Sequence, residues 1–185
     1  TAISGRRMAE TIARRGGIAV IPQDIPHAVV DSVIKWVKQR HVFFDTPITL
    51  NPHQTVADAV SLLHKRAHGA IVIVDGGKPV GIVTEEDCKS VDRFTQLHQV
   101  MSKELITMAD NLDARAAFEF LNQHRHKLAP VVSNNGDLVG IMTRIGALRG
   151  TLYSPAADAN NRLRIAAAVG INGDVAAKAA ALVES

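Results

Sequence analysis

Apolar and polar residues follow a pattern that occurs twice in the middle of the chain. AIVIVD at 70–75 leads through Gly-Gly-Lys-Pro to VGIVT, and APVVSN at 129–134 leads through Asn-Gly-Asp-Leu to VGIMT. Short β-branched runs joined by glycine-containing turns are typical of β-hairpins. Gly81 and Gly140 are 59 residues apart, as are Ala70 and Ala129, whereas PITL and LITM upstream are offset by 58. We therefore predict two similar modules in tandem.

Each module is predicted to contain a strand, an amphipathic helix, the hairpin and a second helix. In the first copy, Val56, Ala59, Val60 and Leu63 recur at helical spacing directly after Thr55-x-x-Asp58, a helix-capping signature. One such module would have a thin hydrophobic core. Two stacked modules would bury each other's exposed faces.

The flanks do not repeat. SGRRMAETIARRGGIAVIP predicts a helix from about Gly5 to Arg15 with Met8, Ile12 and Ala13 buried, a Gly16-Gly17 stop and a strand, and another helix follows Pro26. RLRIAAAVG predicts a strand, followed by a helix that reaches about Val183. This order is typical of an α/β barrel interrupted by an insertion. We thus predict an α/β fold: a fragment of a (β/α)8 TIM barrel at 1–41 and 151–185, with an insert at 42–150 whose two motifs cover about 46–90 and 98–150.

Composition narrows the possible functions. With 46% hydrophobic residues in 185, the chain can build real cores, and its single cysteine, Cys88, excludes an intramolecular disulfide. The net charge is only +3 and 4% of residues are aromatic, so no nucleic-acid surface is expected. The apolar runs are too short to span a membrane. We expect a cytoplasmic protein with no membrane or nucleic-acid partner.

Candidate chemistry lies where each hairpin ends, in GIVTEED at 81–87 and GIMTRIG at 140–146. The Asp87 carboxylate could accept hydrogen bonds from both hydroxyls of a ribose, while the Thr84 hydroxyl donates to a phosphate. The alternative is a capping box, in which both side chains bond only backbone amides. The second copy keeps Thr143 but has Gly146 in place of the carboxylate. We expect one good nucleotide site and one degenerate or absent site.

The segments TVADAVSLLHKRAHGAIVIVD and KPVGIVTEED, with their second copy, resemble a tandem pair of cystathionine-β-synthase (CBS) domains, the Bateman module, over residues 42–150. That family binds adenine or guanine nucleotides between its two motifs, which implies ATP or GTP as an allosteric effector. The residues assigned to nucleotide binding are Ile48, Thr49, Lys65, Thr84, Asp87, Thr107, Arg125, Lys127 and Thr143.

The flanks, GRRMAETIARRGGIAVIPQDIP and RLRIAAAVG, resemble the IMP dehydrogenase and GMP reductase family. WVKQRHVFFDTPITL and LLHKRAHGA are most similar to an actinobacterial branch assigned as GMP reductase. The resemblance implies NADPH-dependent reductive deamination of GMP to IMP and ammonia by a homo-oligomer, a tetramer or octamer. The alternatives are NAD-dependent oxidation of IMP to XMP, or a nucleotide sensor without catalysis.

The resemblance also implies a catalytic cysteine that we expect beyond Ser185, so no catalytic residue is assigned in this sequence. Cys88 is interpreted as structural, because neighbouring carboxylates oppose thiolate formation. The histidines lack the spacing of a metal site, and no metal is expected. Gln23 and Asp24 follow a predicted barrel strand and are candidates for a cofactor pocket. A solvent-exposed turn explains them equally well.

Overall fold

The computed structural model describes residues 5–183, which form two compact units. One unit comprises Phe44–Arg149, and the other combines the chain up to Phe43 with the chain from Gly150. Among the described residues, no helix is both long and apolar enough to cross a membrane.

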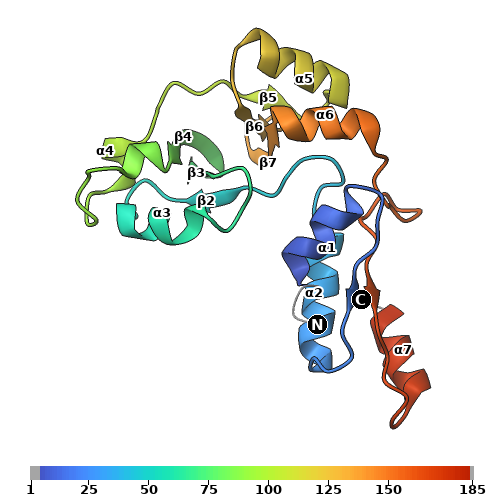
Figure 1. Ribbon diagram of the computed structural model, residues 1–185. Helices are drawn as coiled ribbons and strands as arrows, with labels where there is room; N and C mark the ends of the chain where they lie inside the picture. The colour runs from blue at the N-terminus through green and yellow to red at the C-terminus, as the bar shows by residue number, and fades with distance from the viewer. Residues whose placement is uncertain (1–4, 184–185) are drawn as a thin grey trace. The chain divides into compact units, whose positions relative to one another are not determined.

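The Phe44–Arg149 unit contains the two predicted repeats, each with its own three-stranded sheet and helix (Figure 1). In both sheets the first strand runs parallel to the second, and the second pairs antiparallel with the third. The first sheet consists of β2 (Ile48–Leu50), β3 (Ala70–Asp75) and β4 (Lys78–Thr84), with helices α3 (Val56–Leu63) and α4 (Leu97–Val100). The second consists of β5 (Met108–Ala109), β6 (Leu128–Val132) and β7 (Leu138–Thr143), with helices α5 (Ala114–Gln123) and α6 (Arg144–Leu152).

Helix α3 begins at the predicted capping box. The Thr55 N–H and hydroxyl both donate to Asp58 Oδ2, at 2.9 and 2.8 Å, and the Asp58 N–H approaches Thr55 Oγ1 at 3.4 Å. The buried face of α3 packs on the sheet through Val56, Ala59 and Leu63. The predicted cap and helix are confirmed, except that Val60, expected on the buried face, is 48% exposed.

The two hairpins differ by one residue, which corrects the 59-residue offset assigned to Ala70 and Ala129. Ala70 lies opposite Thr84, and its counterpart opposite Thr143 is Leu128 rather than Ala129. The offset is therefore 58 up to the hairpin turn and 59 after it. The first turn is Gly76-Gly77, both with positive φ, whereas the second runs from Ser133 to Asp137 with positive φ at Gly136. The extra residue lies in the second turn, and each hairpin has one register shift at the equivalent place, between Ile73 and Val74 and between Val131 and Val132.

The expected second helix of the first module does not begin at the turn after β4. A 3₁₀ turn, η1 (Glu86–Cys88), comes first and the four-residue α4 begins only at Leu97, whereas α6 follows β7 directly. Lys89 is already extended, and Ser90 has a φ of 58°, so the backbone leaves the helical region immediately after η1.

The segment that precedes the first strand of each motif, which we call its lead-in, pairs with a strand of the other motif. Asp45, which precedes β2, exchanges two backbone hydrogen bonds with Ile141 of β7, at 3.0 and 2.9 Å. Ser102, which precedes β5, does the same with Ile82 of β4, at 3.0 and 2.9 Å. This reciprocal exchange ties the two motifs together.

The repeat glycines allow this close approach. A Cβ at Gly140 would lie 2.6 Å from the Phe44 Cβ, and a Cβ at Gly81 would overlap the sulfur of Met101. Neither glycine has the positive φ that would require glycine for backbone reasons. Their shared role is therefore to leave room for the segment that crosses from the other motif.

The other unit contains α1 (Arg6–Ala13), β1 (Val20–Ile21), α2 (His27–Lys38), β8 (Ala166–Ala167) and α7 (Val175–Val183). Strands β1 and β8 are parallel neighbours although the Phe44–Arg149 unit separates them in sequence. Met8, expected inside, is 41% exposed. Ala13 is buried as expected and forms the buried face of α1 with Ala9, because their small side chains let the helix pack closely in a cluster that includes Val37 and Leu163.

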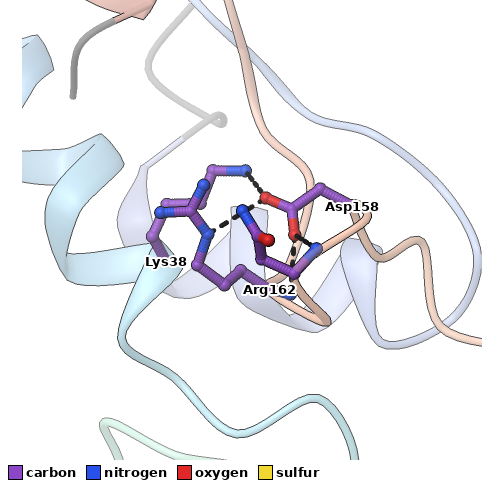
Figure 2. A network of polar contacts seen from close by, with 4 residues as sticks. Lys38, Asp158 and Arg162 are labelled. Atoms are coloured by element: carbon purple, nitrogen blue, oxygen red, sulfur yellow. Dashed lines mark hydrogen bonds and ion pairs between the residues drawn. The ribbon is translucent and has the colours of Figure 1, made fainter.

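A carboxylate cluster closes the loop that follows α6 in this unit (Figure 2). Asp158 Oδ2 accepts from Lys38 Nζ at 2.9 Å and from Arg162 Nε at 3.1 Å, and Oδ1 accepts the backbone N–H groups of Asn160 and Arg162. The hydrogen bond from Lys38, followed by those from the backbone, lowers the pKa of Asp158. The cluster thereby joins the last turn of α2 to residues 158–162.

Candidate nucleotide-binding site

The first sheet places two of the predicted site residues on one face. Thr49 lies opposite Val72, which lies opposite Ile82, and Thr84 is two residues beyond Ile82 on β4. Residues opposite one another share a face, and so do residues two apart on a strand. Two strand spacings of about 4.8 Å and two rises of about 3.3 Å separate Thr49 from Thr84 by roughly 12 Å. Ile48 points the other way, into the core beneath α3.

The Thr84-x-x-Asp87 turn at the end of β4 holds a half-buried carboxylate. Asp87 Oδ2 accepts from the Thr84 N–H at 2.8 Å and from the Thr84 hydroxyl at 2.7 Å. Oδ1 forms no hydrogen bond with the described residues. The pair is thus a capping arrangement through one oxygen, with the second oxygen left as an acceptor.

The Thr55-x-x-Asp58 turn has the same two hydrogen bonds to one carboxylate oxygen, and it is a useful reference. There the first two backbone N–H groups of α3, those of Val56 and Ala57, donate to the carbonyls of Thr95 and Arg93, both at 2.9 Å. Capping accounts for all of its polar contacts. The hydrogen-bond pattern of T-x-x-D therefore does not by itself distinguish a cap from a ligand site.

The second turn lacks a local carboxylate, as the sequence predicts, but another one lies nearby. The Thr143 hydroxyl accepts from the Gly146 N–H at 2.8 Å and caps α6. Asp45 Oδ2 lies 3.6 Å from the point that a Gly146 Cβ would occupy. Sequence reasoning missed Asp45 because it belongs to the lead-in of the first motif, almost a hundred residues before this turn. His68 is near it, and burial lowers the pKa of His68 although Asp45 raises it.

The candidate basic residues are divided between the two turns. Lys65 lies in the loop between α3 and β3, which leads to the strand opposite Thr84. Arg125 follows α5 with a φ of 58°, and the Lys127 carbonyl accepts from the Arg144 N–H at 2.9 Å. Thr107 directly precedes β5. Arg125, Lys127, Thr107 and Thr143 thus belong to the second motif and its turn.

Cys88 adjoins Asp87 but is a poor nucleophile. Burial first, and then the charges of Asp87 and Glu85, raise the pKa of its thiol. The side chain packs against the hydrophobic core of the first motif. Within residues 5–183, no group of three His, Cys, Asp or Glu side chains is arranged to hold a metal ion.

Gln23 and Asp24 line a cavity of about 460 Å³ at the carboxyl ends of β1 and β8. Gln23 lies against Gly170, where a Cβ would come within 3.2 Å of its amide oxygen. Across the cavity, Lys178 Nζ donates to the Asn172 carbonyl at 2.6 Å, and His27 Nε2 is 3.4 Å from the Lys178 carbonyl. The cavity therefore combines apolar walls with several convergent polar groups.

The fold and the paired turns define a tandem pair of α/β motifs, and sequence comparison gives their family. The CBS domain model matches residues 40–92 and again 97–150, more than half of the chain. The chain belongs to the CBS domain family, and the predicted tandem pair is confirmed.

Individual relatives extend the similarity to the flanks. The chain is 46% identical over all 185 residues to GMP reductase of Mycobacterium tuberculosis, of which it covers 39%. It is 34% identical over 189 residues to inosine-5'-monophosphate dehydrogenase of the same species, with 99% of the chain and 36% of the relative aligned. The chain thus spans about two fifths of the length of these relatives. The predicted resemblance to this pair of enzymes is confirmed.

Solved structures show the same fold. GMP reductase from Trypanosoma brucei in complex with guanosine 5'-triphosphate has a TM-score of 0.71 at 24% identity, covering 98% of this chain and 46% of that one. A cysteine-to-alanine variant of that enzyme in complex with guanosine 5'-monophosphate has a TM-score of 0.72 at 25% identity, covering 98% and 40%.

Proposed function

We propose that the Phe44–Arg149 unit binds a purine nucleotide, ATP or GTP, at the turn that follows β4. The observation that carries this proposal is the position of the Thr84–Asp87 pair at the end of β4, with Thr84 on the sheet face of Thr49 and Asp87 held by Thr84 through one carboxylate oxygen. A ribose hydroxyl pair would donate to Asp87 while the base extends along the sheet toward Thr49. The roughly 12 Å between Thr84 and Thr49 suits a nucleoside placed in this way.

We further propose that the module regulates a GMP reductase, which converts GMP to IMP and ammonia with NADPH. The similarity to GMP reductase extends over the whole chain and exceeds that to IMP dehydrogenase of the same bacterium, 46% against 34%. NAD-dependent oxidation of IMP to XMP is the alternative within the same family. Nucleotide binding would shift the enzyme between states with a coupling of about 1 to 3 kcal/mol.

In this proposal, residues 1–41 and 151–185 are parts of a TIM barrel interrupted by the module at 42–150. The parallel pairing of β1 with β8 supports it, because consecutive barrel strands are parallel neighbours however long the insertion between them. Barrel active sites form at the carboxyl ends of the strands, which is where the cavity beside Gln23 and Asp24 lies.

The cavity residues fit part of a dinucleotide, since they offer an amide, a carboxylate and apolar walls within the usual size range of ligand pockets. NADPH, when bound, would supply the hydride. This chain would bind and orient NADPH through Gln23 and Asp24 and through the cavity wall that contains Lys178. Ile145 and Leu152 on α6 are 61% and 69% exposed, which supports self-association into the tetramer or octamer expected of the family.

The enzyme assignment is tested by supplying full-length protein with GMP and NADPH, and separately with IMP and NAD. We expect NADPH consumption and IMP formation in the first mixture only. Turnover only with IMP and NAD would contradict the reductase assignment and identify the enzyme as an IMP dehydrogenase.

The nucleotide site is tested by Asp87→Ala in the full-length protein, with Thr55→Ala as the matched control at the pure cap. Asp87→Ala should weaken ATP or GTP binding by about 1 to 3 kcal/mol, because a charged acceptor is lost. Thr55→Ala should destabilise the fold by about 1 kcal/mol without affecting binding. Unchanged calorimetric affinity in Asp87→Ala would reduce Asp87 to a cap.

A further inference from the structure

Two connecting segments lead to and from the Phe44–Arg149 unit, and both are fastened at the end of α1. The outgoing segment, residues 39–43, follows α2, and the return segment, residues 153–163, follows α6. In the outgoing segment, the His41 carbonyl accepts a hydrogen bond at 3.0 Å from Nε of Arg14, which directly follows α1. In the return segment, a backbone N–H donates to the carbonyl of the last residue of α1 at 2.7 Å. The two segments are therefore anchored at one place on the unit that contains α1 and α2.

The return segment contains a turn at 158–162 that is held by its own hydrogen bonds (Figure 2). Asp158 Oδ1 accepts from the N–H groups of Asn160 and Arg162, both at 2.9 Å, and the Asp158 N–H donates to the Arg162 carbonyl at 2.8 Å. Asn161 completes the turn with a φ of 55°. Because these bonds are made within the turn, it is a preformed block whose shape does not depend on what it docks against.

Among the residues that the structure describes, a single side chain outside this turn bonds to the Asp158 carboxylate. Nζ of Lys38, the last residue of α2, lies 2.9 Å from Asp158 Oδ2, and the two side chains are 19% and 22% exposed. The return segment is also held by the Ala156 N–H, which donates to α1, and by the fully buried Leu163. An ion pair that water can reach adds little stability, so this pair can open while the other two contacts keep the segment in place.

The two elements that meet at this ion pair both lead to the cavity beside Gln23. Helix α2 ends at Lys38, and its first turns line the cavity through His27 and Val30. Strand β8 follows the return segment, and the chain continues from it into the cavity wall at 168–172. The twelve residues of α2 span about 18 Å. A helix and a strand thus connect the ion pair to the cavity, and such rigid elements carry energetic coupling between distant sites.

We propose that the Lys38–Asp158 ion pair is a latch that couples nucleotide binding in the Phe44–Arg149 unit to the cavity beside Gln23. This inference rests on the proposed function and names the residues through which the regulation acts. Helix α6 begins at the turn after β7 and ends immediately before the return segment, so a shift of α6 pulls on the turn that carries Asp158. The closed and open pair are the two states between which the nucleotide shifts the enzyme. Lys38 is a positioning residue, because it acts on the cavity only through α2 and the return segment.

The latch can be broken without disturbing the turn itself. Lys38→Met removes the ion pair and leaves every hydrogen bond within the turn. Lys35→Met is the matched control, because Lys35 also belongs to the last turn of α2 but pairs with Asp31 of the same helix at 3.0 Å. Lys38→Arg keeps the ion pair as the conservative variant. Asp158→Asn breaks the pair from the other side and retains an oxygen for the backbone N–H groups of the turn.

The experiment uses the full-length protein with the substrate and cofactor pair that it turns over. Calorimetry measures ATP and GTP affinity, kcat/KM reports the active site, and hydrogen exchange followed by mass spectrometry reports the amides at 168–172. In the wild type, we expect the bound nucleotide to change kcat/KM about fivefold or more and to alter exchange at 168–172. Lys38→Met and Asp158→Asn should bind the nucleotide with wild-type affinity, but kcat/KM should respond less than about twofold and exchange at 168–172 should not respond. Lys38→Arg and Lys35→Met should behave as the wild type does.

Three results would overturn the inference. The first is a Lys38→Met protein with the full wild-type response, since the ion pair would then only stabilise the return segment, which melting curves would report. The second is an equal loss of response in Lys35→Met, which would make the charge of α2 the cause rather than the pair with Asp158. The third is a wild type that binds the nucleotide without any change at 168–172. In all three the nucleotide site of the proposed function stands. A wild type that binds neither ATP nor GTP would instead contradict the proposed function, and the latch would fall with it.

Discussion

GIVTEED and GIMTRIG descend from one pattern, and the structure shows which parts of it both copies keep. The glycine admits the lead-in of the other motif, and the threonine marks the end of the strand in each. The position of the carboxylate differs between the copies. In the first copy it is Asp87, on the turn itself, whereas the carboxylate near the second turn is Asp45, which belongs to another segment of the chain. The scaffold of a repeat can therefore persist while a polar group moves to a different part of the chain.

The T-x-x-D turn at 55–58 sharpens this comparison. It reproduces the Thr84–Asp87 hydrogen bonds within 0.1 Å, yet its surroundings are closed by the carbonyls of Thr95 and Arg93. What distinguishes the turns is their setting in the sheet, at the end of β4 on the face of Thr49, rather than the capping geometry itself.

The largest expected effect concerns the shared scaffold and compares Gly140→Ala with Gly81→Ala. A methyl at 140 meets the Cβ of fully buried Phe44 and the Asp45 carbonyl, neither of which can move without shifting backbone. A methyl at 81 meets the flexible, partly exposed Met101 side chain. We expect a loss of about 3 kcal/mol of unfolding free energy for Gly140→Ala and about 1 kcal/mol for Gly81→Ala, measured by urea denaturation.

Equal losses of unfolding free energy in the two variants would mean that the segments around Phe44 and Met101 move aside equally easily. The physical asymmetry argued from Phe44 and Met101 would then be wrong. Gly136→Ala is not a suitable control, because its positive φ adds backbone strain of its own.

Two double-mutant cycles compare how strongly the Thr84 and Thr143 hydroxyls are coupled to the carboxylate nearest each of them. Thr84→Val removes a hydroxyl that donates to Asp87, so its cost of about 1 kcal/mol should nearly vanish in an Asp87→Ala background. Thr143→Val removes the acceptor for the Gly146 N–H, and its similar cost should be unchanged in an Asp45→Ser background. Thermal unfolding of the seven proteins, the wild type being common to both cycles, gives both coupling energies. A strong Thr143–Asp45 coupling would show that the two turns are stabilised in the same way.

Much of the fold was predictable because local signals agreed with one another. The capping box at Thr55, the Gly76-Gly77 turn and the β-branched strands all have period and turn chemistry that a single sequence reveals. The tandem pair followed from the repeat alone. Thr84 and Asp87 were identified for the same reason, since their spacing is local.

The rest depended on contacts between distant residues. Asp45 reaches the second turn through strand pairing, which no spacing in the sequence reports. The burial of Met8 was misjudged because the packing of α1 favours small residues, which a hydrophobicity pattern does not predict. The missing helix after Asp87 depended on the conformations of Lys89 and Ser90, which ordinary propensities do not forbid.

The smallest expected effect is a pH dependence of stability that comes from the Asp58 cap of α3. Hydrogen bonds from the backbone N–H and then the hydroxyl of Thr55 lower the pKa of Asp58 below its ordinary value of 3.8. A carboxylate with a lowered pKa stabilises the fold above its unfolded-state pKa, and that contribution is lost as the pH falls through the folded-state value. Asp58→Asn lacks this titration, whereas the Asp158 cluster titrates in both proteins and cancels in the difference. The gap in melting temperature between wild type and Asp58→Asn should therefore narrow as the pH is lowered from 5 toward 3. A gap that stays constant over this range would show that the Thr55 hydrogen bonds do not favour the ionised form, and the turn at 55–58 could then no longer serve as the reference for Thr84-x-x-Asp87.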